Sequence, residues 1–218
     1  MTSFEIKRDF HIHTNFSDGF SSAEEFINLG IKKKIEQICF TDHYSYFKPA
    51  VTNETMNQYF DTIQSLKEKF AKKIQIFVGI EVDTSSVTDF SKLGYYSWDL
   101  ILFEYVFNLP TWDRIFSEVR KFSHDFPNKN VGFAHTRFSR VTHAKFDEVM
   151  SVIREKNLII ELNTGYQNYL DQWFNYLDEE NIFSVGSDAH YLEQLGNISG
   201  ALNFLKKRNI PIDRVIEL

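Results

Sequence analysis

Histidine and carboxylate residues recur in short patterns that could bind metal ions. His11 and His13 are separated by one residue near the start of the 218-residue sequence, and Asp188 and His190 are separated by one residue near its end. Residues at positions i and i+2 of a strand point to the same side, so each pair can present two ligands to one cavity. Imidazole nitrogen and carboxylate oxygen suit zinc, iron and manganese. The two pairs therefore indicate a site for divalent metal ions.

Three further candidates, His43, Glu81 and His135, end separate apolar runs. Seven such runs are short and rich in Ile, Val or Phe, as is typical of strands buried on both faces. They span residues 4–13, 35–43, 74–83, 100–107, 131–135, 158–163 and 183–190. Segments with helical spacing lie between them, over residues 22–33, 57–73, 113–126, 144–156, 169–181 and 193–208. The first of these opens on Ser22 followed by Glu25, a capping signal.

This alternation of strands and helices predicts an α/β fold with a parallel sheet. Seven repeats favour one small closed or nearly closed (β/α) barrel, and an open doubly wound sheet is the alternative. In a parallel barrel the C-terminal ends of the strands share one face, where the loops build the site. Five of the seven histidines would therefore meet there with several carboxylates, whose mutual repulsion a bound cation would remove. We expect a single domain over residues 1–218.

The composition limits the class of partner. The net charge of −6 makes long nucleic acid an unfavourable partner. The only cysteine, Cys39, lies in an apolar run and is expected to be a buried thiol without a chemical role. The N-terminus turns polar at once, and no apolar run is long enough to span a bilayer. We therefore expect a cytoplasmic protein without a membrane partner, while the oligomeric state stays open.

These motifs together resemble the polymerase and histidinol phosphatase (PHP) family of metal-dependent phosphoesterases. The segments that carry the resemblance are DFHIHT at residues 9–14, SDG at 17–19, FTDH at 40–43, GIEV at 79–82, GFAH at 132–135, ELN at 161–163 and VGSDAH at 185–190. They are spread over essentially the whole chain. The resemblance implies a distorted seven-stranded (β/α) barrel of TIM-like type, in agreement with the number of apolar runs.

The resemblance also implies a cluster of two or three divalent ions (Zn, Mn or Fe). Two ions would have complete ligand sets, namely His11, His13, Glu81 and Asp188 for the first and Asp18, His43 and His190 for the second. A third ion would share Glu81 with His135 and need one more ligand, which the family usually supplies as a histidine near the end of the fourth strand. That run carries no histidine here, and Glu104 is the best substitute, because an acidic oxygen can replace imidazole.

Glu104 shares one side of its strand with Leu100 and Leu102 by period-two geometry. If that side faces the barrel mouth, Glu104 can complete a third site; if it faces outward, a two-metal enzyme is expected. Asp42 and Asp83 flank ligand positions, and either could orient a ligand histidine or cap a following helix.

Metal ions in this arrangement would lower the pKa of a bound water and neutralise charge on the group under attack. The resemblance thus implies hydrolysis of a small phosphate ester by a metal-bound hydroxide, with Asp188 and His190 in the catalytic centre. Just past His135, Arg137 or Arg140 could bind a phosphate oxygen through bidentate hydrogen bonds.

The substrate class and two alternatives stay open at this point. A histidinol-phosphatase or nucleotide-phosphoesterase type of substrate fits the family. A metal-dependent hydrolase of C–N or C–O bonds is one alternative, because other metal barrels use similar ligands. A non-catalytic metal-binding PHP domain is the other. Lys48, in the loop after His43, is a further but less favoured candidate for substrate contact.

Overall fold

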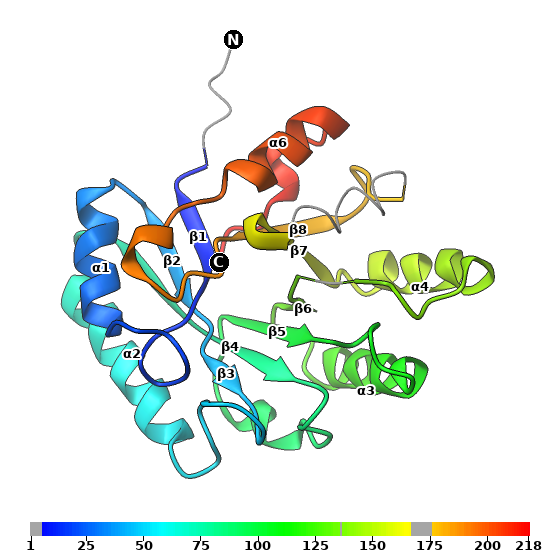
Figure 1. Cartoon of the computed structure of the whole chain (residues 1–218), viewed down its shortest axis with the longest axis horizontal. Helices are drawn as coiled ribbons and strands as arrows, with labels where there is room; N and C mark the ends of the chain where they lie inside the picture. The colour runs from blue at the N-terminus through cyan, green and yellow to red at the C-terminus, as the bar shows by residue number, and fades with distance from the viewer. Residues whose placement is uncertain (1–5, 136, 167–175) are drawn as a thin grey trace.

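Parallel strands form the frame of the molecule in residues 6–135, 137–166 and 176–218, which the computed structural model describes (Figure 1). Their order is β1-β2-β4-β5-β6-β7-β8, with β3 paired to β4. The bounds are β1 Arg8–Ile12, β2 Gln37–Phe40, β3 His43–Tyr44, β4 Gln75–Asp83, β5 Leu100–Glu104, β6 Val131–Phe133, β7 Ile159–Asn163 and β8 Ile182–Gly186. The predicted barrel of seven parallel strands is confirmed, because β2 and β3 together correspond to the single run expected over residues 35–43.

The first and last strands meet at the site end of the barrel. Ile12 forms a parallel bridge with Ala189, just past the end of β8. The backbone N–H of His13 donates to the carbonyl of Ala189 at 2.9 Å, and the N–H of Ala189 donates to the carbonyl of His11 at 3.3 Å. These bonds nearly close the sheet, so the open doubly wound alternative is wrong. They also place the two histidine-containing motifs, one from each end of the sequence, side by side.

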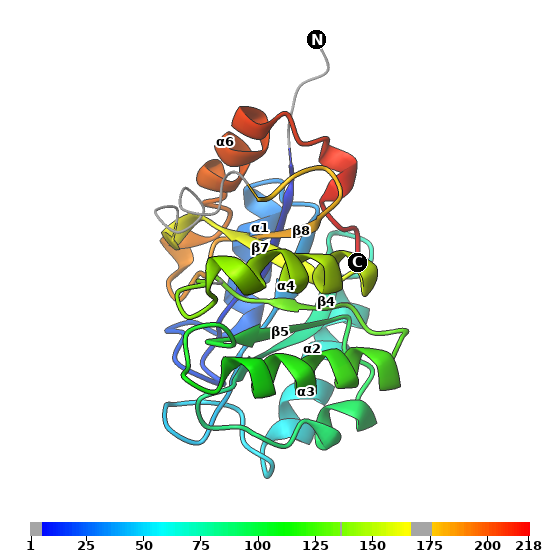
Figure 2. The ribbon, with the colours of Figure 1, turned by 90° about the vertical axis from the view of Figure 1, so that its right-hand side faces the viewer.

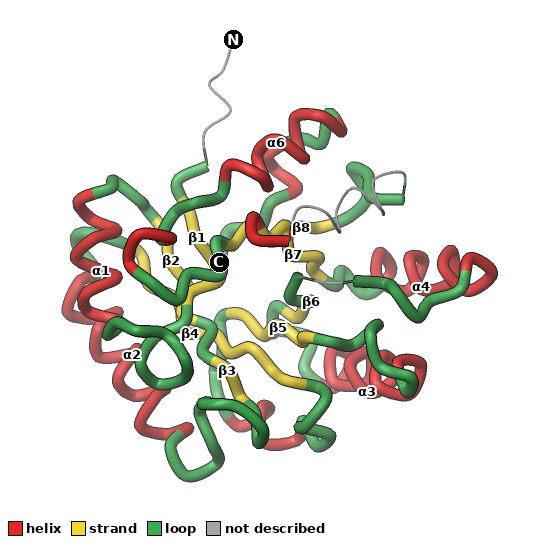
Figure 3. The backbone as a smooth tube through the Cα atoms, in the orientation of Figure 1, coloured by secondary structure: helices red, strands yellow, loops and turns green. Residues whose placement is uncertain are grey.

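Helices cover the outside of the barrel (Figure 3). They are α1 Ala23–Lys32, α2 Met56–Phe70, α3 Trp112–Asp125, α4 His143–Glu155 and α6 Ser199–Arg208. The predicted capping box is present at α1, where Glu25 N–H donates to Ser22 Oγ and Ser22 N–H donates back to the Glu25 carboxylate. Figure 2 shows α3 and α4 next to each other across one side of the barrel wall. No helix of the described ranges is long and apolar enough to cross a membrane.

One predicted helix begins later than expected, and another falls largely outside the described residues. The helix expected over residues 193–208 begins later, at Ser199, because Gly196 adopts a φ of +76° and a short 3-10 turn, Leu192–Gln194, precedes it. That φ ends any regular helix at this point. The helix expected over residues 169–181 lies largely in 167–175, outside the described residues.

Side chains alternate between the barrel interior and the helical layer along most strands, whereas β1 departs from this pattern where its register shifts between Asp9 and Ile12. On β5, Phe103 packs outward against Phe122 of α3, with ring centroids 6.0 Å apart. The residues that fill the interior below the site are Phe10, Cys39, Phe77, Leu100, Leu102, Ala134 and Ile159. Cys39 is buried among them, as expected for a structural thiol. The side of β5 that carries Leu100 and Leu102 is thus the inner one, so Glu104 at the end of the strand also points inward.

Candidate metal centre

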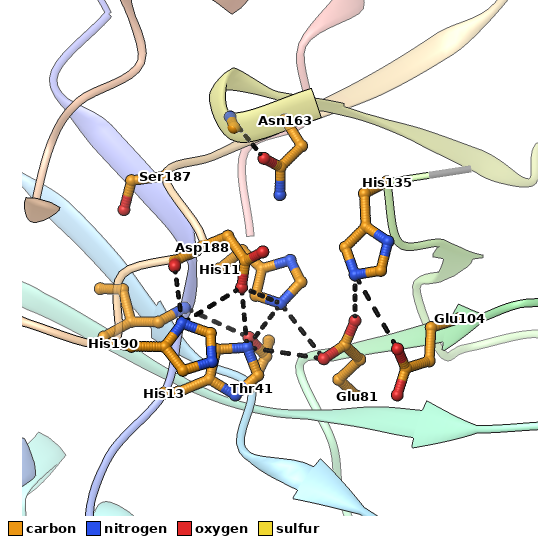
Figure 4. Close-up of polar contacts among 12 residues, drawn as sticks. His11, His13, Thr41, Glu81, Glu104, His135, Asn163, Ser187, Asp188 and His190 are labelled. Carbon is orange, nitrogen blue, oxygen red and sulfur yellow. Dashed lines mark hydrogen bonds and ion pairs between the residues drawn. The ribbon is translucent and has the colours of Figure 1, made fainter. Parts of the chain in front are cut away.

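The first ligand set lies where β1, β4 and the segment after β8 meet (Figure 4). His11 and His13 point to the same side of β1, with their Nε2 atoms 2.9 Å apart. Asp188 Oδ1 lies 3.4 Å from His11 Nε2 and 3.0 Å from His13 Nε2. Glu81 Oε2 lies 3.4 and 3.5 Å from the same two nitrogens. His11, His13 and Asp188 therefore form one compact group of candidate ligands, and Glu81 faces both of its histidines.

Glu161 on β7 orients this set from behind. Its Oε1 accepts a hydrogen bond from His11 Nδ1 at 2.7 Å, which leaves His11 Nε2 to face the centre. Its Oε2 accepts from the backbone N–H of His135 at 2.7 Å. A carboxylate that receives the outer N–H of a ligand histidine fixes the tautomer of that ring and increases its basicity. Gly186 on β8 makes room for the contact, since a Cβ there would come within 2.4 Å of both Glu161 Oε1 and His11 Cβ.

The second ligand set lies beside the first and shares its outer edge. Asp18 is 3.5 Å from His43 Nε2 and 3.2 Å from His190 Nε2. His13 also belongs to this group, with Nδ1 3.6 Å from Asp18 Oδ1. The three residues expected for the second ion are thus together, and His13 lies between the two sets.

The loop that carries Asp18 is held in place by Asp42. The carboxylate of Asp42 accepts from Thr14 N–H at 2.8 Å and from Ser17 Oγ at 2.7 Å. Asp83 has a similar part in another loop, where it accepts from Ser45 Oγ at 2.6 Å. Both acids therefore position loops near the site, which is neither of the two roles expected of them.

The third ligand set lies between β4, β5 and β6. His135 Nε2 is 3.0 Å from Glu81 Oε1 and 4.0 Å from Glu104 Oε2. Glu104 is 1% exposed and points into the barrel mouth, as period-two geometry allowed. His43 Nδ1 also faces this set, at 2.7 Å from Glu81 and 3.4 Å from Glu104. The Lys48 ammonium forms an ion pair with Glu104.

Three residues at the strand ends of the site adopt left-handed backbone conformations. Tyr105 has a φ of 62°, His135 of 26° and Asp188 of 55°. Such conformations cost energy in residues with side chains and concentrate at functional sites. The φ of Tyr105 also explains why β5 ends at Glu104 instead of continuing to residue 107 as expected.

The charged groups of the cluster shift one another's pKa values. Burial alone would lower the pKa of His43, but Glu81, Asp18 and Glu104 around it raise that pKa to about 10. Burial and the neighbouring His43 ring lower the pKa of His13 to about 3. Burial raises the pKa of Glu104 to about 7, and the nearby charge of Glu81 adds to this effect.

The two acids nearest the histidine pair shift the other way. Burial would raise the pKa of Asp188, but His11 and His13 hold it well below its usual range. The same balance holds for Glu81, where His43 and His11 outweigh the effect of burial. Asp188 and Glu81 therefore stay ionised, as ligands of a cation must be.

Buried atoms without hydrogen-bond partners test whether a metal fits. Within residues 6–135, 137–166 and 176–218, these atoms include His13 Nδ1, His43 Nδ1 and both carboxylate oxygens of Glu81. Each is a metal-ligand atom type, and each lies within 4 Å of another candidate ligand atom. Buried polar atoms are almost always paired, so these atoms call for a partner. Divalent cations at more than one position would satisfy them and the facing Nε2 atoms of His11 and His13.

The two arginines expected to bind phosphate lie on the loop after β6. Arg137 is half-buried, two residues past His135. Arg140 is exposed, and its backbone N–H donates to the carbonyl of Phe107 at 3.1 Å. Lys48, given less weight from the sequence, forms an ion pair with Glu104 of the cluster.

Sequence reasoning missed one structural acid altogether. Asp9 is fully buried and accepts from Ser187 N–H at 2.9 Å, Ser187 Oγ at 2.6 Å and Gly196 N–H at 2.8 Å. It thereby ties β1 to the segment that presents Asp188. The sequence feature that could have revealed this role is the position of Asp9 in an apolar run, two residues before His11. An acid that is buried there needs hydrogen-bond partners.

Comparisons with known proteins agree with this geometry. The PHP domain family model matches residues 9–171. The DNA polymerase/3'-5' exonuclease PolX of Bacillus subtilis is 25% identical over 219 residues, which cover 93% of this chain and 37% of that protein. The histidinol-phosphatase of Lactococcus lactis is 32% identical over 78 residues, which cover 35% of this chain and 29% of that protein. The matched regions thus make up well under half of either curated relative.

A solved structure extends the likeness to the whole fold. It is the histidinol phosphate phosphatase of Lactococcus lactis in complex with zinc, L-histidinol and phosphate. The two folds superpose with a TM-score of 0.65 at 20% identity, over 95% of each chain.

Proposed function

Because the chain belongs to the PHP domain family, we propose that it is a metal-dependent phosphoesterase that hydrolyses a small phosphate ester. The convergence of five histidines with Asp18, Glu81 and Asp188 at one end of the barrel supports this proposal most directly. These side chains come from strands far apart in the sequence. No structural need of the barrel explains why their metal-binding atoms face one another.

The proposal assigns the donor sets to individual ions. His11, His13, Glu81 and Asp188 would hold one divalent ion, and Asp18, His43 and His190 a second. Zinc, manganese and iron all suit these donors, and the related histidinol phosphate phosphatase was crystallised with zinc. Bound there, the ions would supply Lewis acidity, which lowers the pKa of water and neutralises charge on phosphate.

The protein side chains would position the ester. Arg137, on the loop after β6, can bind a non-bridging phosphate oxygen through its two-pronged guanidinium group. Arg140 is the second candidate on the same loop. Glu161 keeps His11 Nε2 aimed at the centre. Asp42 holds the loop of Asp18.

Exposed aromatic rings on the loops that follow the strand ends of the site support an ester with a planar ring. Five of the six exposed large apolar side chains in the described ranges lie on loops that follow strand ends of the site: Phe20, Tyr46, Phe47, Tyr105 and Tyr191. Phe20 and Tyr191 stack with centroids 4.4 Å apart, and Phe20 N–H donates to the carbonyl of His190 at 2.8 Å. Aromatic rings of this kind stack favourably on other planar groups. An imidazole or nucleobase on the substrate would have such a surface beside the centre.

The PolX match favours one second candidate, a phosphodiesterase acting on the end of a DNA strand. That relative is named as a 3'-5' exonuclease, and its match covers 93% of this chain. The net charge of −6 opposes it, because binding to nucleic acid depends on cationic contacts with phosphates.

A substrate screen tests both candidates. Protein loaded with Mn, Zn or Fe should release phosphate from histidinol phosphate or a mononucleotide, and Asp188→Ala should abolish both turnover and metal content. Arg137→Ala or Arg140→Ala should raise the KM for phosphate esters with the metals retained.

Phe20→Ala should raise the KM for ring-bearing esters only. Tyr95→Ala is its control, since Tyr95 is an exposed aromatic residue just before β5. Turnover of single-stranded DNA alone would favour the exonuclease candidate, and no turnover of any phosphate ester would refute the proposal.

A further inference from the structure

Lys48 makes an unusual contact for a lysine in a loop. Its ammonium forms an ion pair with Glu104, a carboxylate that is 1% exposed. The lysine side chain is itself only 24% exposed. Glu104 in turn lies 3.4 Å from His43 Nδ1 and 4.0 Å from His135 Nε2. The ammonium is thus in contact with the third ligand set and is not a solvated surface charge.

The surroundings of Lys48 fix the loop that carries it. Val51 N–H donates to the carbonyl of His43 at 2.7 Å, and Phe47 N–H donates to Ser45 Oγ at 3.1 Å. Ser45 Oγ also donates to the carboxylate of Asp83 at 2.6 Å. These bonds anchor the loop on both sides of the lysine, so the ammonium is presented to Glu104 by a built structure.

The Tyr105 ring adds a second contact for the ammonium. Lys48 Nζ lies 5.5 Å from the centroid of that ring, within the range of a cation–π interaction. Thr84, just past β4, donates through its Oγ1 to the carbonyl of Glu104 at 2.7 Å. The carboxylate and its cationic partner are therefore both held in place.

The negative charges of Glu81 and Glu104 indicate what the Lys48 ammonium replaces. Glu81 and Glu104 bring two carboxylates to the set that also contains His135, and paired acids of this kind need a cation between them. A metal ion bound to Glu104 would lie about 2.0–2.2 Å from its oxygen. Lys48 Nζ already contacts Oε1 of that carboxylate, and a metal ion on either oxygen of Glu104 would lie close enough to the ammonium for strong repulsion. The ammonium and a third metal ion thus exclude each other.

We propose that Lys48 takes the place of a third metal ion, so that the chain binds two divalent ions and the ammonium supplies the third positive charge beside Glu104. The inference rests on the metal centre of the proposed function but not on its substrate. In the loaded enzyme, the ammonium is a fixed donor at the edge of the centre that can contact an anionic oxygen of the substrate.

Metal counting without substrate tests the proposal. Wild type, Lys48→Met, Glu104→Gln and the double variant are each saturated with Mn, freed of unbound ions and measured for metal per chain. Lys67→Met is a matched control, since Lys67 forms an ion pair with Asp99 at 2.9 Å just before β5 begins, at the opposite end of that strand.

The expected counts differ by about one ion. Wild type, Glu104→Gln and Lys67→Met should hold two ions, and Lys48→Met should hold three because Glu104, Glu81 and His135 become free to bind one. The double variant should return to two. A wild-type count of three that falls in Glu104→Gln overturns the proposal, and so does a folded Lys48→Met that stays at two. If Lys48→Met does not fold, Lys48→Gln replaces it, and the wild-type and Glu104→Gln counts still decide.

This outcome is separable from that of the proposed function. Inactive protein that shows the expected counts would refute the phosphoesterase and keep the role of Lys48. Active protein with three ions would do the reverse.

Discussion

Glu161 shows how single residues prepare the centre. One of its oxygens accepts from His11 Nδ1 and the other from the backbone N–H of His135. The same carboxylate therefore sets the tautomer of one candidate ligand and the position of another. Asn163, two residues further along β7, donates to Glu161 Oε1 at 3.1 Å and completes its hydrogen bonds. A residue outside the ligand sets can thus position two candidate metal ligands.

Protonation of His43 leads to a pH prediction. Burial would lower its pKa, but Glu81, Asp18 and Glu104 raise it to about 10, so the ring is charged at neutral pH in the metal-free chain. This pairing stabilises the metal-free fold below the ordinary histidine pKa of about 6.5, and the stabilisation is lost as the pH rises through about 10. A metal ion must displace that proton, so its affinity should rise about tenfold per pH unit between these limits.

Calorimetry can measure this proton. Titrations of the metal-free protein with Mn, in buffers of different ionisation enthalpy near neutral pH, should give a net release of about one proton or more per chain. Lys67→Met, distant from the centre, should release the same number. Metal binding that released no proton, with an affinity independent of pH, would show that His43 is neutral before the metal enters.

Close packing between elements depends on Gly186, where β8 passes β1 and β7. A Cβ at this position would come within 2.4 Å of His11 Cβ and of Glu161 Oε1. Because His11 is fully buried on β1, it cannot move away without disturbing the strand. Gly186→Ala should therefore destabilise the protein by about 1–3 kcal/mol and weaken metal binding by about 10–100-fold.

Gly30→Ala gives the matched comparison. Gly30 lies in α1, and the nearest atom to an added Cβ is the flexible end of Ile74, at 3.2 Å. Urea unfolding and metal titration of both variants separate a general packing effect from a local one. Equal metal affinity in Gly186→Ala and wild type would mean that the contact between Glu161 and His11 does not support the site.

At the scale of the whole molecule, the metal centre joins both ends of the sequence. Its candidate ligands come from β1, β3, β4, β5 and the segments after β1, β6 and β8, so the complete set exists only in the folded barrel. A ligand that binds the folded state alone stabilises it, by about 2.7 kcal/mol at a concentration of 100 times its Kd. For a chain of this length, each kcal/mol moves the Tm by about 2–4 °C.

Saturation with a preferred metal should therefore raise the Tm by about 5 to 11 °C for each ion. Thermal unfolding with a chelator and then with Mn or Zn measures the difference. Asp188→Ala should lose most of the shift due to the first ion. Identical Tm values with chelator and with excess metal would contradict a metal centre that spans the barrel.

Much of this arrangement follows from local sequence. Period-two alternation predicted that His11 and His13 point together and that Glu104 shares a side with Leu100 and Leu102. Short apolar runs predicted the seven strands, because a strand that is buried on both faces carries apolar residues on both of its sides. The capping box at Ser22 was also predictable, since it depends on residues three positions apart.

Only the tertiary structure decided the contacts that join distant loops. Asp42 and Asp83 hold loops, and Asp9 anchors the segment of Asp188. These roles could not be predicted, because the partners lie far along the chain or in turns without periodicity. The left-handed backbone at Tyr105 ended β5 early, which no propensity of tyrosine indicates. Lys48 reaches Glu104 across 56 positions of sequence, and such a contact depends on where a loop folds back. Spacing along a strand is set by bond geometry, whereas loop placement is set by all the surfaces that the loop meets.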